Sequence, residues 1–251
     1  YRLGRVLSFI LWVRPNHLIP LEYFMLINAD FSQRASLVPE AHQWIKSPQN
    51  GVERVMLDRV GAEKARATSL VHYAPNSYFP HHMHPGGEEI LVLSGTFSAD
   101  DTHYPAGWYL RNPPSSGHRP YSDEGAVIFV KLRQMSSDET QHVAIDTYND
   151  ANWQQQGNRT VCPLFSDGVE HVSLQRIDAG ELLFTETVHG GAEILVVAGE
   201  LIEGGQVYQQ DSWIRLPIDT SVQIKAGVEG ATIYLKTGHL NRVIGLDIED
   251  A

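Results

Sequence analysis

The chain has 251 residues, enough for one large domain or for two of ordinary size. Hydrophobic residues make up 42% of it, which supplies a substantial core and excludes a disordered chain. The formal net charge is −11, and no basic stripe is present, which argues against a nucleic-acid partner because phosphate binding depends on clustered Lys and Arg.

The N-terminal segment contains an apolar run of only eight residues, from Val6 to Val13. A membrane-spanning helix needs about 20 residues, so we expect no membrane association. Residues 1–27 are predicted to form an N-terminal extension or an arm that packs on a partner subunit, and the arm favours a homodimer. Cys162 is the only cysteine, which excludes an intramolecular disulfide and fits a reduced, cytoplasmic setting.

The chain contains a tandem duplication. Residues 69–95 align without a gap to residues 173–199, at an offset of 104 residues, with nine of 27 positions identical. Seven of those identities fall in the ten residues from Gly86 to Gly95. A repeat of this length indicates two copies of one folding unit. We therefore predict two similar domains, at residues 28–135 and 136–251.

Each repeat is predicted to be all-β. Residues 88–94, 126–132 and 231–236 are rich in β-branched and aromatic side chains, and Gly and Pro separate them. Short strands with frequent turns are typical of a sandwich or barrel. Residues 39–45 and 150–155, just before each repeat, are predicted to be either short helices or polar loops.

One cluster of residues in the first repeat has the chemistry of a metal site. His82 and His84 alternate along a predicted strand, so their side chains point to the same side. The Pro-Gly-Gly turn that follows reverses the chain and brings Glu88 back toward them. His118, at the end of a turn-rich segment, is the natural fourth ligand. Imidazole nitrogens and a carboxylate oxygen suit a borderline divalent cation.

These residues resemble the cupin motifs. His82, His84, Glu88 and Gly95 match the first motif, and Pro105, Gly107 and His118 match the second. The HMHPGGEE stretch and the step of 34 residues from His84 to His118 resemble the cupin domain of the ChrR-like anti-sigma factors. The resemblance covers about residues 28–132, with a degenerate copy at about 160–238. It implies two tandem jelly-roll barrels, the first holding zinc with His82, His84, Glu88 and His118.

The second repeat lacks this cluster. At the offset of 104, the four positions hold Glu186, Val188, Ala192 and Val222, so we predict no metal there.

Glu89 and Arg111 have counterparts in the repeat that lacks the ligands, namely Glu193 and Arg215. A structural role is therefore favoured for both residues. Tyr73 and Tyr109 are candidates to line the first barrel.

The resemblance implies a zinc-binding module that senses or responds to oxidants such as singlet oxygen or organic hydroperoxides. A protein partner in a regulatory pathway is implied in the same way, although we expect this chain to lack the family's N-terminal anti-sigma domain.

The alternative is a cupin metalloenzyme, an Fe-, Mn- or Ni-dependent dioxygenase or isomerase with open coordination positions for a small molecule. The residue types do not determine which metal binds, because sites with nitrogen and oxygen ligands follow the same order of affinity among divalent metals.

Overall fold

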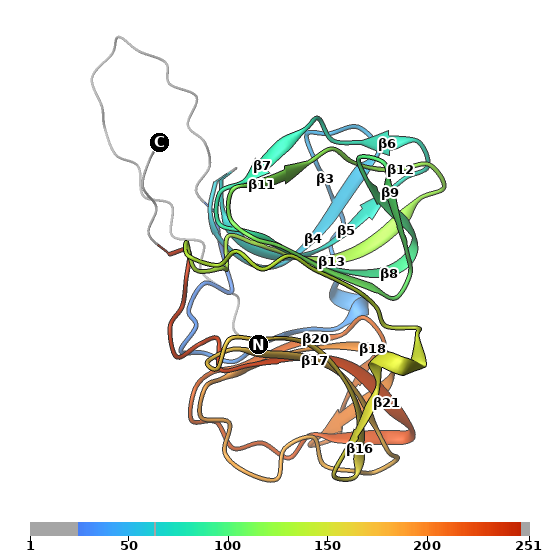
Figure 1. The fold of residues 1–251 in the computed structure, drawn as a ribbon. Helices are drawn as coiled ribbons and strands as arrows, with labels where there is room; N and C mark the ends of the chain where they lie inside the picture. Colours follow the sequence, from blue (N-terminus) through green and yellow to red (C-terminus); the bar gives the residue numbers. More distant parts are fainter. Residues whose placement is uncertain (1–24, 63, 247–251) are drawn as a thin grey trace, which may run out of the picture.

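The computed structural model describes residues 25–62 and 64–246. Most of the predicted N-terminal extension, residues 1–24, lies outside this range. The described chain is built from β-strands and forms two barrels, stacked one on the other (Figure 1). The predicted all-β fold with two jelly-roll barrels is confirmed. Within the described ranges, no helix is long and apolar enough to cross a membrane.

The first barrel is formed mainly by an antiparallel sheet with the strand order β1-β4-β5-β13-β8-β10-β14, to which β3, β6, β9 and β12 are added, and by the separate pair β7 and β11. Its strands are β1 (Met25–Ile27), β3 (Ile45–Lys46), β4 (Val52–Gly61), β5 (Arg66–Tyr73), β6 (Ser77–Tyr78), β7 (His82–His84), β8 (Glu88–Ala99), β9 (Thr102–Pro105), β10 (Trp108–Asn112), β11 (Ser116–His118), β12 (Pro120–Ser122), β13 (Ala126–Leu132) and β14 (Val143–Asp146).

The second barrel has the strand order β15-β16-β17-β21-β18-β20-β2, with β19 paired to β18. Its strands are β2 (Ala35–Leu37), β15 (Gln154–Gln156), β16 (Arg159–Ser166), β17 (His171–Ile177), β18 (Ala192–Glu203), β19 (Gln206–Gln209), β20 (Trp213–Leu216) and β21 (Lys225–Thr237). Strands β8 and β18 both have 12 residues and lie 104 positions apart. The following strands β9 and β19 have four residues each and the same offset, so the duplication in the sequence is also a structural repeat.

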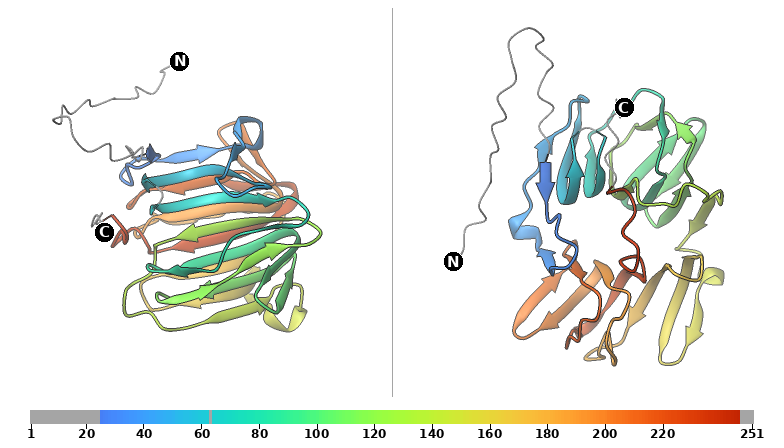
Figure 2. Two further views of the ribbon diagram at one scale, coloured as in Figure 1. Left: turned by 90° about the horizontal axis from the view of Figure 1, so that it is seen from above. Right: turned by 90° about the vertical axis from the view of Figure 1, so that its left-hand side faces the viewer.

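The barrels exchange edge strands. Strand β2 lies in the sequence between β1 and β3 of the first barrel, yet it pairs with β20 of the second. Strand β14 follows the first repeat, yet it pairs with β10 of the first barrel. The right-hand view of Figure 2 shows the blue N-terminal segment running from the first barrel to the edge of the second. Each of these two strands therefore belongs to a different barrel from the one that the predicted domain boundary, between residues 135 and 136, would give it.

The two short segments predicted to be helices or polar loops each contain a single 3-10 turn, η1 (Pro39–Ala41) and η2 (Asp150–Asn152). Each lies on the chain between the barrels, just before its repeat.

Strand alternation gives each barrel wall two faces. In β8, Ile90 and Val92 belong to the core inside the first barrel, whereas Leu91 belongs to a core shared with the second barrel. Successive side chains of a strand point to opposite faces, so the same strands line an interior and build an interface. The shared core includes Phe129 of the first barrel with Trp213 and Tyr234 of the second.

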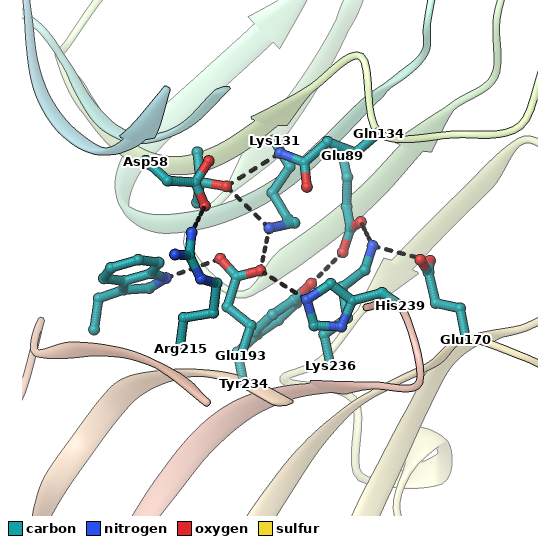
Figure 3. Close-up of polar contacts among 12 residues, drawn as sticks. Asp58, Glu89, Lys131, Gln134, Glu170, Glu193, Arg215, Tyr234, Lys236 and His239 are labelled. Carbon is teal, nitrogen blue, oxygen red and sulfur yellow. Dashed lines mark hydrogen bonds and ion pairs between the residues drawn. The ribbon is translucent and has the colours of Figure 1, made fainter. Parts of the chain in front are cut away.

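A buried ionic network crosses this interface. Lys131 of the first barrel forms an ion pair with Glu193 of the second, and Lys236 of the second lies 2.9 Å from Glu89 of the first. Figure 3 shows the two lysines directed in opposite senses across the interface. Arg111 lies 3.3 Å from Glu89.

Arg215 lies 3.4 Å from Asp58 across the same interface. Glu89 and Arg111 thus have the structural role predicted for them, together with their counterparts Glu193 and Arg215. Tyr109 also lies in this interface rather than in the barrel interior, because it shares a strand face with Arg111.

Candidate metal centre

The four predicted ligands come together at one end of the first barrel. Strands β7 and β11 pair so that His82 lies opposite His118, and His84 lies opposite Ser116. The turn after β7 closes with a backbone hydrogen bond of 3.2 Å from Gly87 to the carbonyl of His84. This turn leads directly into β8, whose first residue is Glu88.

The ligand atoms of His82, His84, Glu88 and His118 all lie within 4.8 Å of one another. Nε2 of His84 lies 3.5 Å, and Nε2 of His118 3.4 Å, from the same carboxylate oxygen of Glu88. Both Nε2 atoms are buried and have no hydrogen-bond partner. Buried polar atoms are normally hydrogen-bonded, so two buried nitrogens without a partner beside one carboxylate oxygen fit a bound cation.

Neighbouring polar groups orient the ligands. The Ser116 hydroxyl donates to the carbonyl of Pro113 at 2.6 Å, so it accepts from Nδ1–H of His84 at 3.1 Å. This leaves the Nε2 lone pair of His84 available. The side-chain amide of Asn112 donates to Oε2 of Glu88 at 3.2 Å. Such contacts fix the tautomer and orientation of metal ligands.

Burial sets the protonation of the cluster. It lowers the pKa of His84 to about 3 and that of His118 to about 4, with the neighbouring histidines adding to the effect. Both imidazoles are therefore neutral at physiological pH, as metal ligands must be. Burial also raises the pKa of Glu88 to about 7, although the hydrogen bond from Asn112 opposes this.

The cluster adjoins a cavity of about 500 Å³ inside the first barrel. Glu88 and His82 form part of its wall, and Tyr73 lines it as the sequence predicted. The remaining wall is largely apolar and includes Val71, Ile128, Val130 and Leu132. Volumes of about 300–1,000 Å³ are typical of small-molecule sites.

The corresponding part of the second barrel is filled by apolar side chains. Val188 and Ala192, which replace His84 and Glu88, are buried in the interior core of that barrel, and Val222, which replaces His118, packs against it. His189 lies outside this core and forms an exposed ion pair of 2.8 Å with Asp219. The same fold thus packs with a polar cluster in one copy and with hydrophobic residues in the other.

Sequence reasoning did not identify the two orienting residues, Asn112 and Ser116. Both are close in sequence to a predicted ligand or to the second motif, but their roles depend on strand pairing that the sequence does not display.

Comparison with known proteins supports the fold and the motif. Residues 32–136 match the family described as the ChrR cupin-like domain. No curated protein sequence matches the chain. A candidate dioxygenase from Nostoc punctiforme has a TM-score of 0.68 at 14% identity, with 85% of this chain and 86% of that chain covered.

Two Escherichia coli proteins are also similar in fold. Ylba has a TM-score of 0.61 at 17% identity, with 94% of this chain and 100% of that chain covered. The bacterial pirin YhhW, solved in complex with nickel(II), has a TM-score of 0.60 at 11% identity, with coverages of 82% and 98%. All three matches extend over both barrels, and identities this low show the fold alone. The family match and the His–Glu cluster coincide in one barrel, so the part of the chain that is similar to the ChrR cupin-like domain family, residues 32–136, is also the part that holds the cluster.

Proposed function

We propose that the first barrel holds one divalent metal ion on His82, His84, Glu88 and His118. The observation that carries this proposal is the pair of buried, unpartnered Nε2 atoms of His84 and His118 beside one oxygen of Glu88. When bound, such an ion acts as a Lewis acid or as a redox centre, according to its identity.

Cobalt(II) titration of the chelated protein tests the ligand set. Wild type is expected to develop the visible absorption bands of a protein-bound Co(II) site at one equivalent. H84A and H118A are expected to lose most of this signal, whereas H72A and H189A, which alter histidines outside the cluster, keep it. Equal signals from H84A and wild type would contradict the assignment.

The cavity beside the cluster favours a centre that acts on a small molecule. A structural zinc site is closed by four protein ligands, whereas a catalytic metal keeps a position open. Here the apolar cavity reaches both His82 and Glu88, so a molecule in it meets the ligand cluster directly. We therefore propose a metal-dependent cupin enzyme, a dioxygenase or isomerase that uses Fe, Mn or Ni.

The protein's own residues supply binding and orientation in this reaction. The apolar wall formed by Val71, Ile128, Val130 and Leu132 excludes water from an apolar substrate. Asn112 and Ser116 hold Glu88 and His84 in place through hydrogen bonds. Oxygen-electrode measurements with a panel of small diketones and thiols test the dioxygenase form. Uptake that depends on the metal and is lost in H118A supports it. Absence of uptake and of substrate isomerisation from Fe-, Mn- and Ni-loaded protein contradicts the enzyme proposal.

A second candidate is a zinc-binding module that senses oxidants such as singlet oxygen or organic hydroperoxides, in a regulatory pathway with a protein partner. The match to the ChrR cupin-like family favours it. Sensing would not use the thiol, because Cys162 is fully buried and burial raises its pKa to about 11. Reactive cysteines are accessible and have a lowered pKa.

This candidate predicts that loss of the gene changes the cellular response to singlet oxygen or to an organic hydroperoxide. An unchanged response would count against sensing and against a link to anti-sigma regulation.

Cellular setting and assembly also belong to the proposal. We propose a reduced, cytoplasmic location, on the grounds of a single cysteine, and a homodimer. Light scattering of the full chain gives the mass directly, and a value of about 28 kDa, the mass of one chain, would contradict the dimer.

A further inference from the structure

The cavity in the first barrel has a positive lining in an acidic protein. Arg54 and Arg59 both contribute to its wall. Among the described residues that line it, Glu88 is the only carboxylate, and the proposed metal would neutralise that charge. The cavity therefore favours a negatively charged guest, although the chain as a whole carries a net charge of −11.

Strand register separates the arginines from the ligand cluster. Glu88 pairs with Leu132, Leu132 with Ala67, and Ala67 with Arg59, so Glu88 and Arg59 lie three strands apart. At roughly 4.8 Å per strand, this is roughly 14 Å along the curved wall. Arg54 lies on the same strand as Arg59, and its partner on the neighbouring strand is Val71.

Apolar side chains cover the wall between the two ends. Leu132, Val130, Ile128 and Val71 project from β13 and β5 into the cavity. A guest that touches both the arginine strand and the ligand cluster must therefore lay an apolar body across this surface.

Arg54 is the cation that needs a partner. The side chain is partly buried, and its Nε atom is buried without a hydrogen-bond partner. No ion pair or hydrogen bond joins the Arg54 side chain to any residue in the described part of the chain. Arg59 differs, because its guanidinium donates to the carbonyl of Ala62.

Burial of the Arg54 Nε atom without a partner is unfavourable, and a carboxylate in the cavity could accept two parallel hydrogen bonds from the guanidinium. We infer that the first barrel binds a small organic carboxylate, with its carboxyl group on Arg54, its apolar chain along Val71, Ile128 and Val130, and its other end at the ligand cluster. The last part of this inference rests on the proposed metal centre.

Calorimetric titration of the metal-containing protein tests the inference. The probes are straight-chain carboxylates from butanoate to decanoate and the matching uncharged amides. At least one acid is expected to bind wild type more tightly than its amide. R54M is expected to weaken binding of that acid by roughly 10- to 100-fold, the loss of a charge-assisted hydrogen-bonded pair, and to leave amide binding unchanged.

Two further variants control for folding and charge. R54K keeps a cation and is expected to retain part of the preference for the acid over the amide. K225M removes an exposed charge from the second barrel and is expected to bind like wild type. Metal content and thermal unfolding, measured for each variant, show that the site is otherwise intact.

The inference is overturned if no acid binds more tightly than its amide, or if R54M binds the acid as wild type does. Acid binding that disappears on chelation but survives in R54M would place the carboxylate on the metal, which also overturns it. These outcomes leave the metal centre standing as long as wild type retains its ion. Absence of the ion from wild type is a failure of the metal proposal itself.

Discussion

At the scale of single residues, Ser116 decides which nitrogen of His84 faces the ligand cluster. Its hydroxyl group donates to the carbonyl of Pro113, so the hydroxyl oxygen accepts a hydrogen bond from Nδ1–H of His84. The hydrogen bond keeps Nε2 unprotonated and directed toward Glu88. A residue outside the proposed ligand set thus orients one of the proposed ligands.

We expect S116A to weaken metal binding by about 10- to 100-fold, the usual effect of losing such a contact, with little change in folding. Competition with a chromophoric chelator measures the affinity. S98A is a matched control, because Ser98 also contacts a histidine, His103, at 2.9 Å, away from the ligand cluster. Equal losses in S116A and S98A would show a general effect on the barrel instead of an effect on His84.

At the scale of one strand, β8 sends two neighbouring glutamates to opposite sides of the barrel wall. Glu88 points inward to the ligand cluster. Glu89 points to the interface between the barrels, where it meets Lys236 of the second barrel and Arg111 of the first. The two carboxylates share a sequence neighbourhood and a buried setting, yet they serve different parts of the molecule.

Substitution of each glutamate by Gln separates these roles. E88Q is expected to lose most bound metal. The free energy of unfolding of the metal-free protein is expected to change by no more than about 1 kcal/mol, because Gln resembles the neutral, protonated form of Glu88. E89Q is expected to keep its metal and to lose about 3 kcal/mol of stability, because buried cations lose their partner. Metal analysis and urea unfolding report both quantities, and loss of metal from E89Q would contradict the division.

Much of this element-level organisation can be predicted from the sequence. The alternation of His82 and His84, the Gly turn and the repeat comparison predicted the cluster, and the copies Glu193 and Arg215 predicted structural roles for Glu89 and Arg111. Alternation with a period of two residues and internal duplication can both be recognised in a single sequence.

Other features depend on tertiary contacts. The exchange of β2 and β14 is one, because such short edge strands fit several partners by pattern alone. The contacts of Asn112 and Ser116, and the position of Arg54 in the cavity, follow from strand register. Tyr109, a candidate to line the first barrel, lies in the interface instead, because the sequence does not show which face of the sheet each residue of its strand occupies.

At the scale of the whole molecule, the two barrels are joined by a shared apolar core that encloses reciprocal ion pairs. Burial alone would raise the pKa of Glu89, but Lys236 and Arg111 outweigh it and lower the pKa to about 2. A carboxyl group whose pKa is lower in the folded state stabilises the fold above its unfolded pKa, about 4.5 here. That contribution is lost as the pH falls through about 2.

We therefore expect the free energy of unfolding to fall more steeply between pH 4.5 and pH 2 in wild type than in E89Q. Urea unfolding across this range measures the two slopes. Identical slopes would show that Glu89 does not carry this part of the acid sensitivity of the interface.

We propose that one barrel of this duplicated fold holds a metal ion and that the other does not. Elemental analysis of protein purified without added metal measures this difference between the barrels. We predict one divalent ion per chain, lost in H84A and H118A; Fe, Mn or Ni would favour the enzyme and zinc the sensor. Protein without metal, or about two ions per chain with one retained in H84A, would contradict the claim.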